Sequence, residues 1–266
     1  MNGKVLIVAG SDSGGGAGIQ ADIKTVTALG GYAMTAITAL TAQNTLGVEG
    51  IFDVPPEFVA QQMRVVLSDI GADCIKIGML HRPDIVEAVC EVLRTDCIHI
   101  PVVVDPVMMA KGGAALLTAE AMTALKTQLI PLARVLTPNL PEAEALAGGA
   151  AVSAADLATA ILDLGPQAVL LKGGHADGPI LRDILAEQGR AMEVFEGPRI
   201  DTPHTHGTGC TLASAIAAGL AQGLALPSAV VRARAYVLEA ISLAPGFGHG
   251  HGPLNHTHTV RAFPDG

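Results

Sequence analysis

Short apolar runs recur along the chain, and stretches long enough for a helix separate them. Short apolar runs bounded by turn residues are typical of strands that are covered on both faces. Strands that alternate with helices predict an α/β fold with a mostly parallel central sheet and helices on both faces. We interpret as strands the runs 5–9, 33–40, 74–77, 102–104, 135–137 and 169–171, and as helices 18–29, 55–68, 84–93, 119–129 and 154–162.

The composition agrees with this class of fold. Half of the 266 residues are hydrophobic but only 3% are aromatic, so Ala, Val, Leu and Ile must form the core. The length is that of one domain, 1–266, in which about residues 246–266 form a tail rich in glycine and histidine. The four cysteines form no C-x-x-C pair, and we expect reduced thiols.

The charge and hydropathy of the chain exclude several partners. A formal charge of −9 argues against nucleic acid, although one local pocket could still hold a small anion. No apolar run reaches membrane length, and the first one is too short for a signal peptide. We therefore expect a soluble, cytoplasmic protein.

Parallel sheets bind ligands beyond the carboxyl ends of their strands. The residues that follow the predicted strands are therefore candidates for a binding site. They are polar or glycine, with one flexible methionine among them: Gly10–Gly18, Gln43, Met79, Asp105, Asn139–Glu142 and Lys172.

A glycine-rich loop, SDSGGGAG at 11–18, follows the first strand. Its glycines do not fit G-x-G-x-x-G in either register, and the chain contains no Gly-Lys-Ser/Thr of a Walker A loop. The loop is therefore either a tight strand-to-helix turn or the cradle of a ligand other than a nucleotide.

A better anion site lies at 207–210, where Gly-Thr-Gly-Cys precedes an apolar repeat of helical spacing. The first amides of a helix lack partners, and the helix dipole favours negative charge there. Ordinary capping by Thr208 is the alternative explanation. A thiol in the first helical turn has its thiolate favoured, which makes Cys210 a candidate base or nucleophile.

Seven segments, in chain order, closely resemble the hydroxymethylpyrimidine/phosphomethylpyrimidine kinases of the ribokinase-like superfamily. HGTGCT together with the glycine loop is specific to this family, whereas TPN-x-x-E marks only the superfamily. The segments are AGSDSGGGAGIQAD (9–22), TAQNT (41–45), KIGML (76–80), DPVM (105–108), TPNLPEAE (137–144), LLKGGH (170–175) and HGTGCT (206–211).

The resemblance implies that ATP phosphorylates 4-amino-5-hydroxymethyl-2-methylpyrimidine and then its monophosphate, in thiamine biosynthesis. It implies that Gln43 recognises the aminopyrimidine, because a side-chain amide offers both a donor and an acceptor. Gly10 and Asp22 would help to form the pyrimidine pocket, and Met79 would contact the ring. Taken singly, each residue has an ordinary structural explanation, such as a core position for methionine.

The residues that would bind the phosphoryl donor, ATP, follow from the same resemblance. Lys172, Asn139 and Thr208 would bind ATP, and Asp105 and Glu142 would organise Mg²⁺ through waters. Acidic residues after strands also frequently cap helices, which is the alternative for this pair.

The amides of Gly207, Thr208, Gly209 and Cys210 would hold the developing phosphoryl charge. Sugar kinases of the superfamily carry GAGD at this helix start, with aspartate as base. This chain has Cys210 there, as in the pyrimidine kinase branch. We expect the helix terminus to lower the pKa of Cys210 and the thiol to serve as base.

Two further segments carry open hypotheses. Lys111, Gly112 and Gly113 could form a flap over the phosphates or an exposed turn. His249, His251, His256 and His258 could bind a metal, although we favour a role in the fold.

Two alternative functions stay open. One is a kinase of pyridoxal-type vitamers, because Cys210 could accommodate an aldehyde. The other is a catalytically silent vitamer-binding protein, against which the intact donor-side residues argue. The family also suggests a homodimer.

Overall fold

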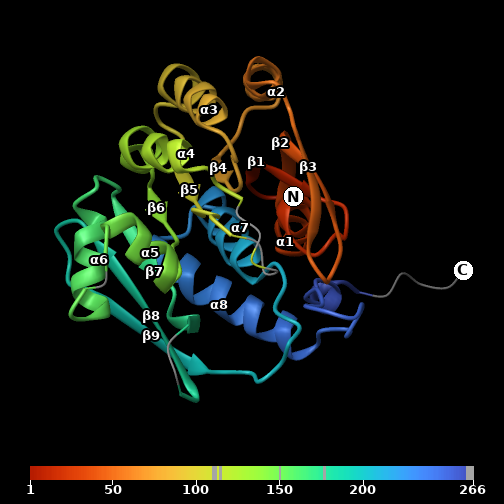
Figure 1. Ribbon diagram of the computed structural model, residues 1–266, viewed down its shortest axis with the longest axis vertical. Coiled ribbons are helices and arrows are strands. Elements are labelled where there is room, and N and C mark those ends of the chain that lie inside the picture. The colour runs from red at the N-terminus through yellow and green to blue at the C-terminus, as the bar shows by residue number, and fades with distance from the viewer. Residues whose placement is uncertain (110–112, 114–115, 150, 176–177, 262–266) are drawn as a thin grey trace, which may run out of the picture.

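The computed structural model describes residues 1–109, 113, 116–149, 151–175 and 178–261. These residues form a nine-stranded sheet in the order β3-β2-β1-β4-β5-β6-β7-β8-β9 (Figure 1). The strands are β1 (Lys4–Asp12), β2 (Tyr32–Gln43), β3 (Val48–Asp53), β4 (Cys74–Ile77), β5 (Val102–Val104), β6 (Val135–Leu136), β7 (Ala168–Leu171), β8 (Ile180–Glu187) and β9 (Glu193–Pro198).

The six strands predicted from apolar runs, β2, β1, β4, β5, β6 and β7, form the parallel centre of the sheet. The prediction of a mostly parallel sheet is confirmed. Antiparallel strands extend it at both ends: β3 pairs with β2, and β8 and β9 follow β7. These three were not predicted, because their half-exposed faces break up the apolar runs.

Helices cover both faces of the sheet, as predicted (Figure 1). The side chains of β1 alternate: Leu6 and Val8 pack into the core under α2 to α6, whereas Val5 and Ile7 pack into the core under α1, α7 and α8. The helices are α1 (Gly18–Ala28), α2 (Pro56–Asp69), α3 (Pro83–Asp96), α4 (Ala119–Ala124), α5 (Leu140–Ala147), α6 (Ala154–Leu162), α7 (Thr208–Ala221) and α8 (Leu226–Ser242).

The predicted helix 119–129 is only partly α-helical. α4 ends at Ala124, a π-helical turn covers Leu125–Leu129, and a 3₁₀ turn with Pro131 follows. Proline cannot supply the amide that a continuing α-helix needs, so the segment ends there. No helix of the described residues is both long and apolar enough to cross a bilayer.

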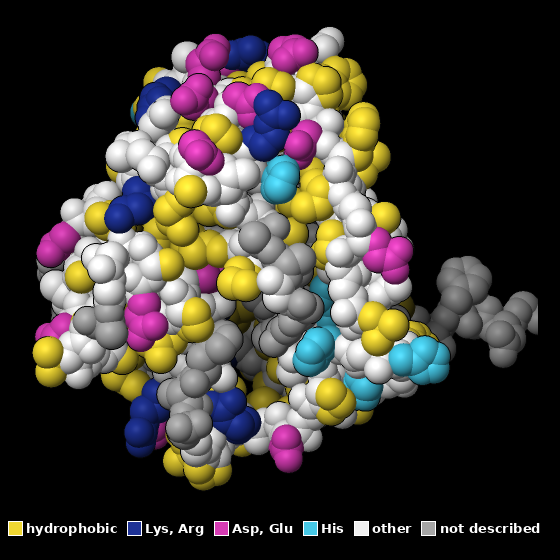
Figure 2. All heavy atoms as spheres, in the orientation of Figure 1, with side chains coloured by type: hydrophobic (Ala, Val, Ile, Leu, Met, Phe, Trp, Pro, Cys, Tyr) yellow, Lys and Arg dark blue, Asp and Glu magenta, His cyan; other side chains and the backbone are white. Residues whose placement is uncertain are grey.

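The C-terminal segment packs onto the turn between β2 and β3. The backbone amide of His251 donates to the carbonyl oxygen of Thr45 (2.9 Å), and that of His249 donates to the Thr45 hydroxyl (3.2 Å). The amide of His206 donates to the carbonyl of Gly252 (3.1 Å). Histidines gather on one side of the face drawn in Figure 2. The glycines at 248, 250 and 252 are there because a side chain would collide with Thr45 or His204.

Candidate active site

Helix α7 begins where the sequence predicted an anion site. Gly207 is its N-cap, in the left-handed conformation (φ 83°), and Thr208 is its first residue. The Thr208 hydroxyl donates to the carbonyl of Thr205 (2.7 Å), so ordinary capping by Thr208 is excluded. Among the described residues, the amides of Gly209 and Cys210 have no hydrogen-bond partner. Two N–H groups are thus available to an anion.

Lys172, after β7, brings a positive charge to this point. Its Nζ lies 3.0 Å from Oδ1 of Asp105, after β5, and 3.9 Å from Oε2 of Glu142. A methyl group added to Gly209 would lie 3.3 Å from Lys172 Nζ and from Asp105 Oδ2. The three charged side chains that follow separate strands therefore meet beside the first turn of α7.

Asn139 and Glu142 form a capping box at the start of α5. The amide of Glu142 donates to Asn139 Oδ1 (2.9 Å), and the amide of Asn139 donates to Glu142 Oε2 (2.8 Å). The helix-capping alternative for Glu142 therefore holds, while its carboxylate also faces Lys172. Burial raises the pKa of Glu142 to about 7 against the opposing effect of Lys172, and Asp105 adds to the rise.

The side chain of Asp22, which the resemblance places in the pyrimidine pocket, lies inside the protein. Its carboxylate has no exposed surface. One oxygen accepts from Lys76 Nζ (2.8 Å) and the other from the Ser214 hydroxyl of α7 (2.7 Å). This burial follows from helix geometry: Asp22 lies on the face of α1 that packs against the sheet and α7.

Lys76 is a buried charge that the sequence analysis missed. It lies in β4 and has no exposed surface. Burial alone would lower the pKa of Lys76, but the acidic groups around it, Asp22 first among them, together raise it, so the side chain stays an ammonium. A lysine inside an otherwise apolar strand, CIKI, was the available signal.

Cys210 is the third residue of α7, and its predicted pKa shift was wrong in sign. Burial raises the pKa of Cys210 to about 12; the ammonium of Lys76 opposes this rise, and Asp22 adds to it. The residue is only partly exposed. Loss of solvent outweighs the helix dipole here, so the thiol is protonated at neutral pH.

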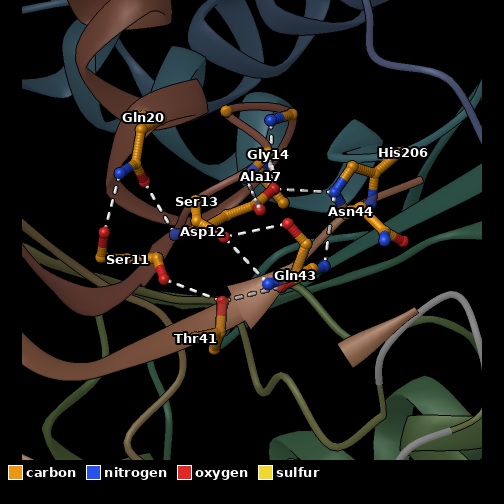
Figure 3. Close-up of polar contacts among 12 residues, drawn as sticks. Ser11, Asp12, Ser13, Gly14, Ala17, Gln20, Thr41, Gln43, Asn44 and His206 are labelled. Atoms are coloured by element: carbon orange, nitrogen blue, oxygen red, sulfur yellow. Dashed lines mark hydrogen bonds and ion pairs between the residues drawn. The ribbon is translucent and has the colours of Figure 1, made fainter. Parts of the chain in front are cut away.

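Asp12 organises the glycine loop (Figure 3). Its carboxylate accepts from the amides of Gly14 (2.8 Å), Gly16 (3.0 Å) and Ala17 (2.8 Å), and it lies 2.8 Å from His206 Nε2. Burial alone would raise the pKa of Asp12, but the hydrogen bonds from His206 and the loop amides hold it below its ordinary value.

His206 directly precedes the N-cap of α7, so its contact with Asp12 joins the glycine loop to the start of that helix. A side chain at Gly207 would collide with the carbonyl of Gly16. Asp12 and His206 were quoted in motifs but given no role, because nothing local in the sequence shows that they meet.

The residues that the resemblance assigns to the pyrimidine substrate lie beside the glycine loop. Gln43, at the end of β2, is half-buried, and its side chain reaches towards His206 (Figure 3). Gly10 is buried next to Met79, whose sulfur would lie 3.2 Å from a methyl group at that glycine. The Met79 carbonyl accepts from the Thr38 hydroxyl (2.6 Å). Gly10, Gln43 and Met79 thus share one edge of the sheet.

The two open segments have different outcomes. Lys111 and Gly112 lie outside the described residues, so the flap stays a hypothesis. The tail histidines separate: His251 Nδ1 lies 3.1 Å from the Pro203 carbonyl, whereas His256 Nδ1 lies 3.2 Å from the Tyr236 hydroxyl. Among the described residues, no three His, Cys, Asp or Glu side chains gather as a metal site.

The fold and the site together define a ribokinase-like small-molecule kinase. The crystal structure of an ADP complex of Bacillus subtilis pyridoxal kinase superposes with a TM-score of 0.87 at 36% identity, over 97% of this chain and 98% of that one. Residues 12–255 match the Phosphomethylpyrimidine kinase family. The chain belongs to that family.

Two curated relatives support the assignment. The hydroxymethylpyrimidine/phosphomethylpyrimidine kinase of Streptomyces coelicolor is 49% identical, over 95% of this chain and 93% of its own length. The thiamine biosynthesis bifunctional protein of Geobacter sulfurreducens is 53% identical over 96% of this chain, which spans only about half (52%) of that relative.

Proposed function

We propose that the chain transfers a phosphoryl group from ATP to the hydroxymethyl group of 4-amino-5-hydroxymethyl-2-methylpyrimidine, and then to the resulting monophosphate, in thiamine biosynthesis. Full-length similarity to the Streptomyces kinase supports this reaction. The observation that carries it is the meeting of two free amides, Gly209 and Cys210, with the Lys172 ammonium. This arrangement suits an anion that changes its charge during transfer.

On the donor side, Lys172, Asn139 and Thr208 would bind ATP. Burial alone would lower the pKa of Lys172, but Asp105 and Glu142 raise it above its ordinary value, which favours the charged ammonium. The amides from Gly207 to Cys210 would hold the phosphoryl group as it moves. Little covalent chemistry is required of the protein, because positioning and charge stabilisation dominate phosphoryl transfer.

Asp105 and Glu142 fit a magnesium site of the kind that Mg²⁺ uses in kinases. That ion is usually held by one or two carboxylates together with waters and substrate phosphates. These carboxylates face one another across Lys172 Nζ. When bound there, Mg²⁺ would offset the negative charge of the ATP phosphates.

On the acceptor side, Gln43 would bind the aminopyrimidine edge, with Gly10 and Met79 against the ring. Asp22 would contribute to the pyrimidine pocket indirectly, through its ion pair with Lys76. Cys210 is one of the residues whose amides would hold the transferring group, but its raised pKa makes its thiol a poor base in the ligand-free protein. Its backbone amide therefore carries the larger share of the proposed role.

The test is phosphorus NMR of the products formed from Mg-ATP and the hydroxymethylpyrimidine. We expect the monophosphate first and the diphosphate later. Lys172→Met should lower kcat by roughly 10²- to 10³-fold, since it removes one charge aimed at the phosphoryl group. Lys126→Met, in the π-helical turn and outside the proposed site, is the matched control. Absence of both products with the wild-type protein would refute the proposal.

A second candidate is phosphorylation of pyridoxal, favoured by the similarity to the Bacillus pyridoxal kinase. Parallel reactions with pyridoxal as the only acceptor separate the two, and we expect the pyrimidine to have the higher kcat/KM. A silent binding protein would show neither product. The cytoplasmic location remains a proposal from the charge and hydropathy of the sequence, and the homodimer remains a proposal from the resemblance.

A further inference from the structure

Gln43 lies between two polar side chains, Thr41 and His206 (Figure 3). Its Oε1 is 3.1 Å from Thr41 Oγ1, and its Nε2 is 3.5 Å from His206 Nε2. The nitrogen and oxygen of a side-chain amide exchange places after a half-turn about the last bond. The hydrogen-bond network therefore has to decide which atom faces which neighbour.

The hydrogen bonding of Thr41 requires the amide nitrogen of Gln43 to face it. Thr41 Oγ1 has a single hydrogen, and the carbonyl oxygen of Ser11 lies 2.9 Å away to accept it. With that hydrogen used, Thr41 presents only lone pairs to Gln43. An amide oxygen at 3.1 Å would be repelled, whereas an amide N–H would donate a hydrogen bond.

The hydrogen bonding of His206 requires the amide oxygen of Gln43 to face it. His206 Nε2 lies 2.8 Å from Asp12 Oδ2, and three backbone amides also donate to that carboxylate. A carboxylate is an acceptor only, so Nε2 must carry a hydrogen and donate it. A second N–H, from the Gln43 amide, would be repelled by that hydrogen, whereas the amide oxygen would share it.

We infer that Thr41 and the Asp12–His206 pair fix the Gln43 amide with its nitrogen towards Thr41 and its oxygen towards His206. They are positioning residues, because they act through Gln43. A primary amide has two N–H donors and two oxygen lone pairs, and each neighbour uses one of them. One N–H donor and one oxygen lone pair of the Gln43 amide remain for the substrate, and the network sets which of the two lies on which side.

The consequence concerns substrate selectivity and rests on the proposed function. In the 4-aminopyrimidine, the exocyclic nitrogen donates and the adjacent ring nitrogen accepts. In the 4-oxo analogue, the exocyclic oxygen accepts and the protonated ring nitrogen donates. A freely turning amide would pair with either ring, but a fixed amide pairs only with the ring whose donor and acceptor are arranged to match it. The network should therefore select the amino ring and reject the oxo ring.

The test compares kcat/KM for 4-amino-5-hydroxymethyl-2-methylpyrimidine and for its 4-oxo analogue, in wild type, Thr41→Val and Thr41→Ser. We expect the wild type to prefer the amino ring by roughly 100-fold or more. Thr41→Val is nearly isosteric but removes one of the two contacts that fix the amide, so this preference should fall at least about tenfold. Thr41→Ser keeps the hydroxyl and should keep the preference. The KM for ATP should be the same in all three.

Two results would overturn the inference: an unchanged preference in Thr41→Val, or an equal loss of preference in Thr41→Ser. A purely structural effect would change kcat/KM for both rings alike and leave the ratio of the two values constant. Urea unfolding identifies a variant that fails to fold, in which case Thr41→Ala replaces Thr41→Val. If the wild type phosphorylates neither ring, the proposed function fails, and calorimetric binding of the two rings to the same variants still tests the orientation.

Discussion

The ammonium of Lys76 and the carboxylate of Asp22 form an ion pair of 2.8 Å, and neither side chain has any exposed surface. The pair lies between β4 and α1, and the Ser214 hydroxyl of α7 completes it. A charge pair that is shut off from water is stable only while both partners are present. Its position between the sheet and α7 makes it a structural support of the proposed active site.

Removing only one partner should therefore be costly. We expect Lys76→Met to lower the free energy of unfolding by about 3–5 kcal/mol, because it leaves the Asp22 carboxylate buried and unpaired. The double variant Asp22→Asn with Lys76→Met should recover much of this loss, since asparagine still accepts from Ser214. Urea denaturation measures both. A single variant as stable as the wild type would contradict this account.

Gly207 and Gly223 have nearly the same positive φ, 83° and 81°, but different surroundings. A side chain at Gly207 would strike the Gly16 carbonyl, whereas nothing lies within 4 Å of one at Gly223. We expect Gly223→Ala to cost about 1 kcal/mol of stability and no activity. Gly207→Ala should lower kcat/KM by roughly 100-fold, because it displaces the free amides. Similar kcat/KM values for the two variants would show that the contact with Gly16 is unimportant.

The raised pKa of Cys210, about 12, predicts a slow thiol. At pH 8 iodoacetamide should modify Cys210 at least roughly 100-fold more slowly than free cysteine, because only the thiolate reacts. The rate should still rise with pH above 9. Mass spectrometry of the peptide follows the modification, and Cys210→Ala confirms which peptide it is. Rapid labelling at neutral pH would mean that Cys210 is a thiolate there, as the sequence analysis expected, and would contradict this prediction.

His256 should make stability depend on pH. Burial lowers the pKa of His256 to about 4, so the unfolded chain binds a proton more readily than the folded one. Stability from this residue is present above about pH 6.5 and is lost as the pH falls towards 4, by up to about 3 kcal/mol. Urea unfolding at several pH values should show this slope in the wild type.

His256→Gln provides the matched control for that slope. Glutamine can still accept a hydrogen bond from the Tyr236 hydroxyl, which lies 3.2 Å from His256 Nδ1, but it does not titrate. The unfolding free energy of this variant should fall less steeply between pH 6.5 and 4. Equal slopes in the two proteins would mean that other groups cause the acid sensitivity.

The sequence by itself determined the parallel centre of the sheet and the start of α7. The runs at 74–77 and 102–104 are strands with the predicted bounds, because a buried strand must be apolar on both faces. The glycines at 207 and 209 mark the helix start for a similarly local reason, since backbone conformation and close approach restrict the residue type. The antiparallel strands β3, β8 and β9 lack such a local pattern.

Only the tertiary structure decided how the charged groups pair. Asp22 meets Lys76 across 54 residues, and Asp12 meets His206 across 194. Such partners depend on which strands and helices become neighbours, and no local spacing records that. The pKa of Cys210 was misjudged for the same reason: its position in the helix is local, but the loss of solvent around its thiol is produced by the whole fold.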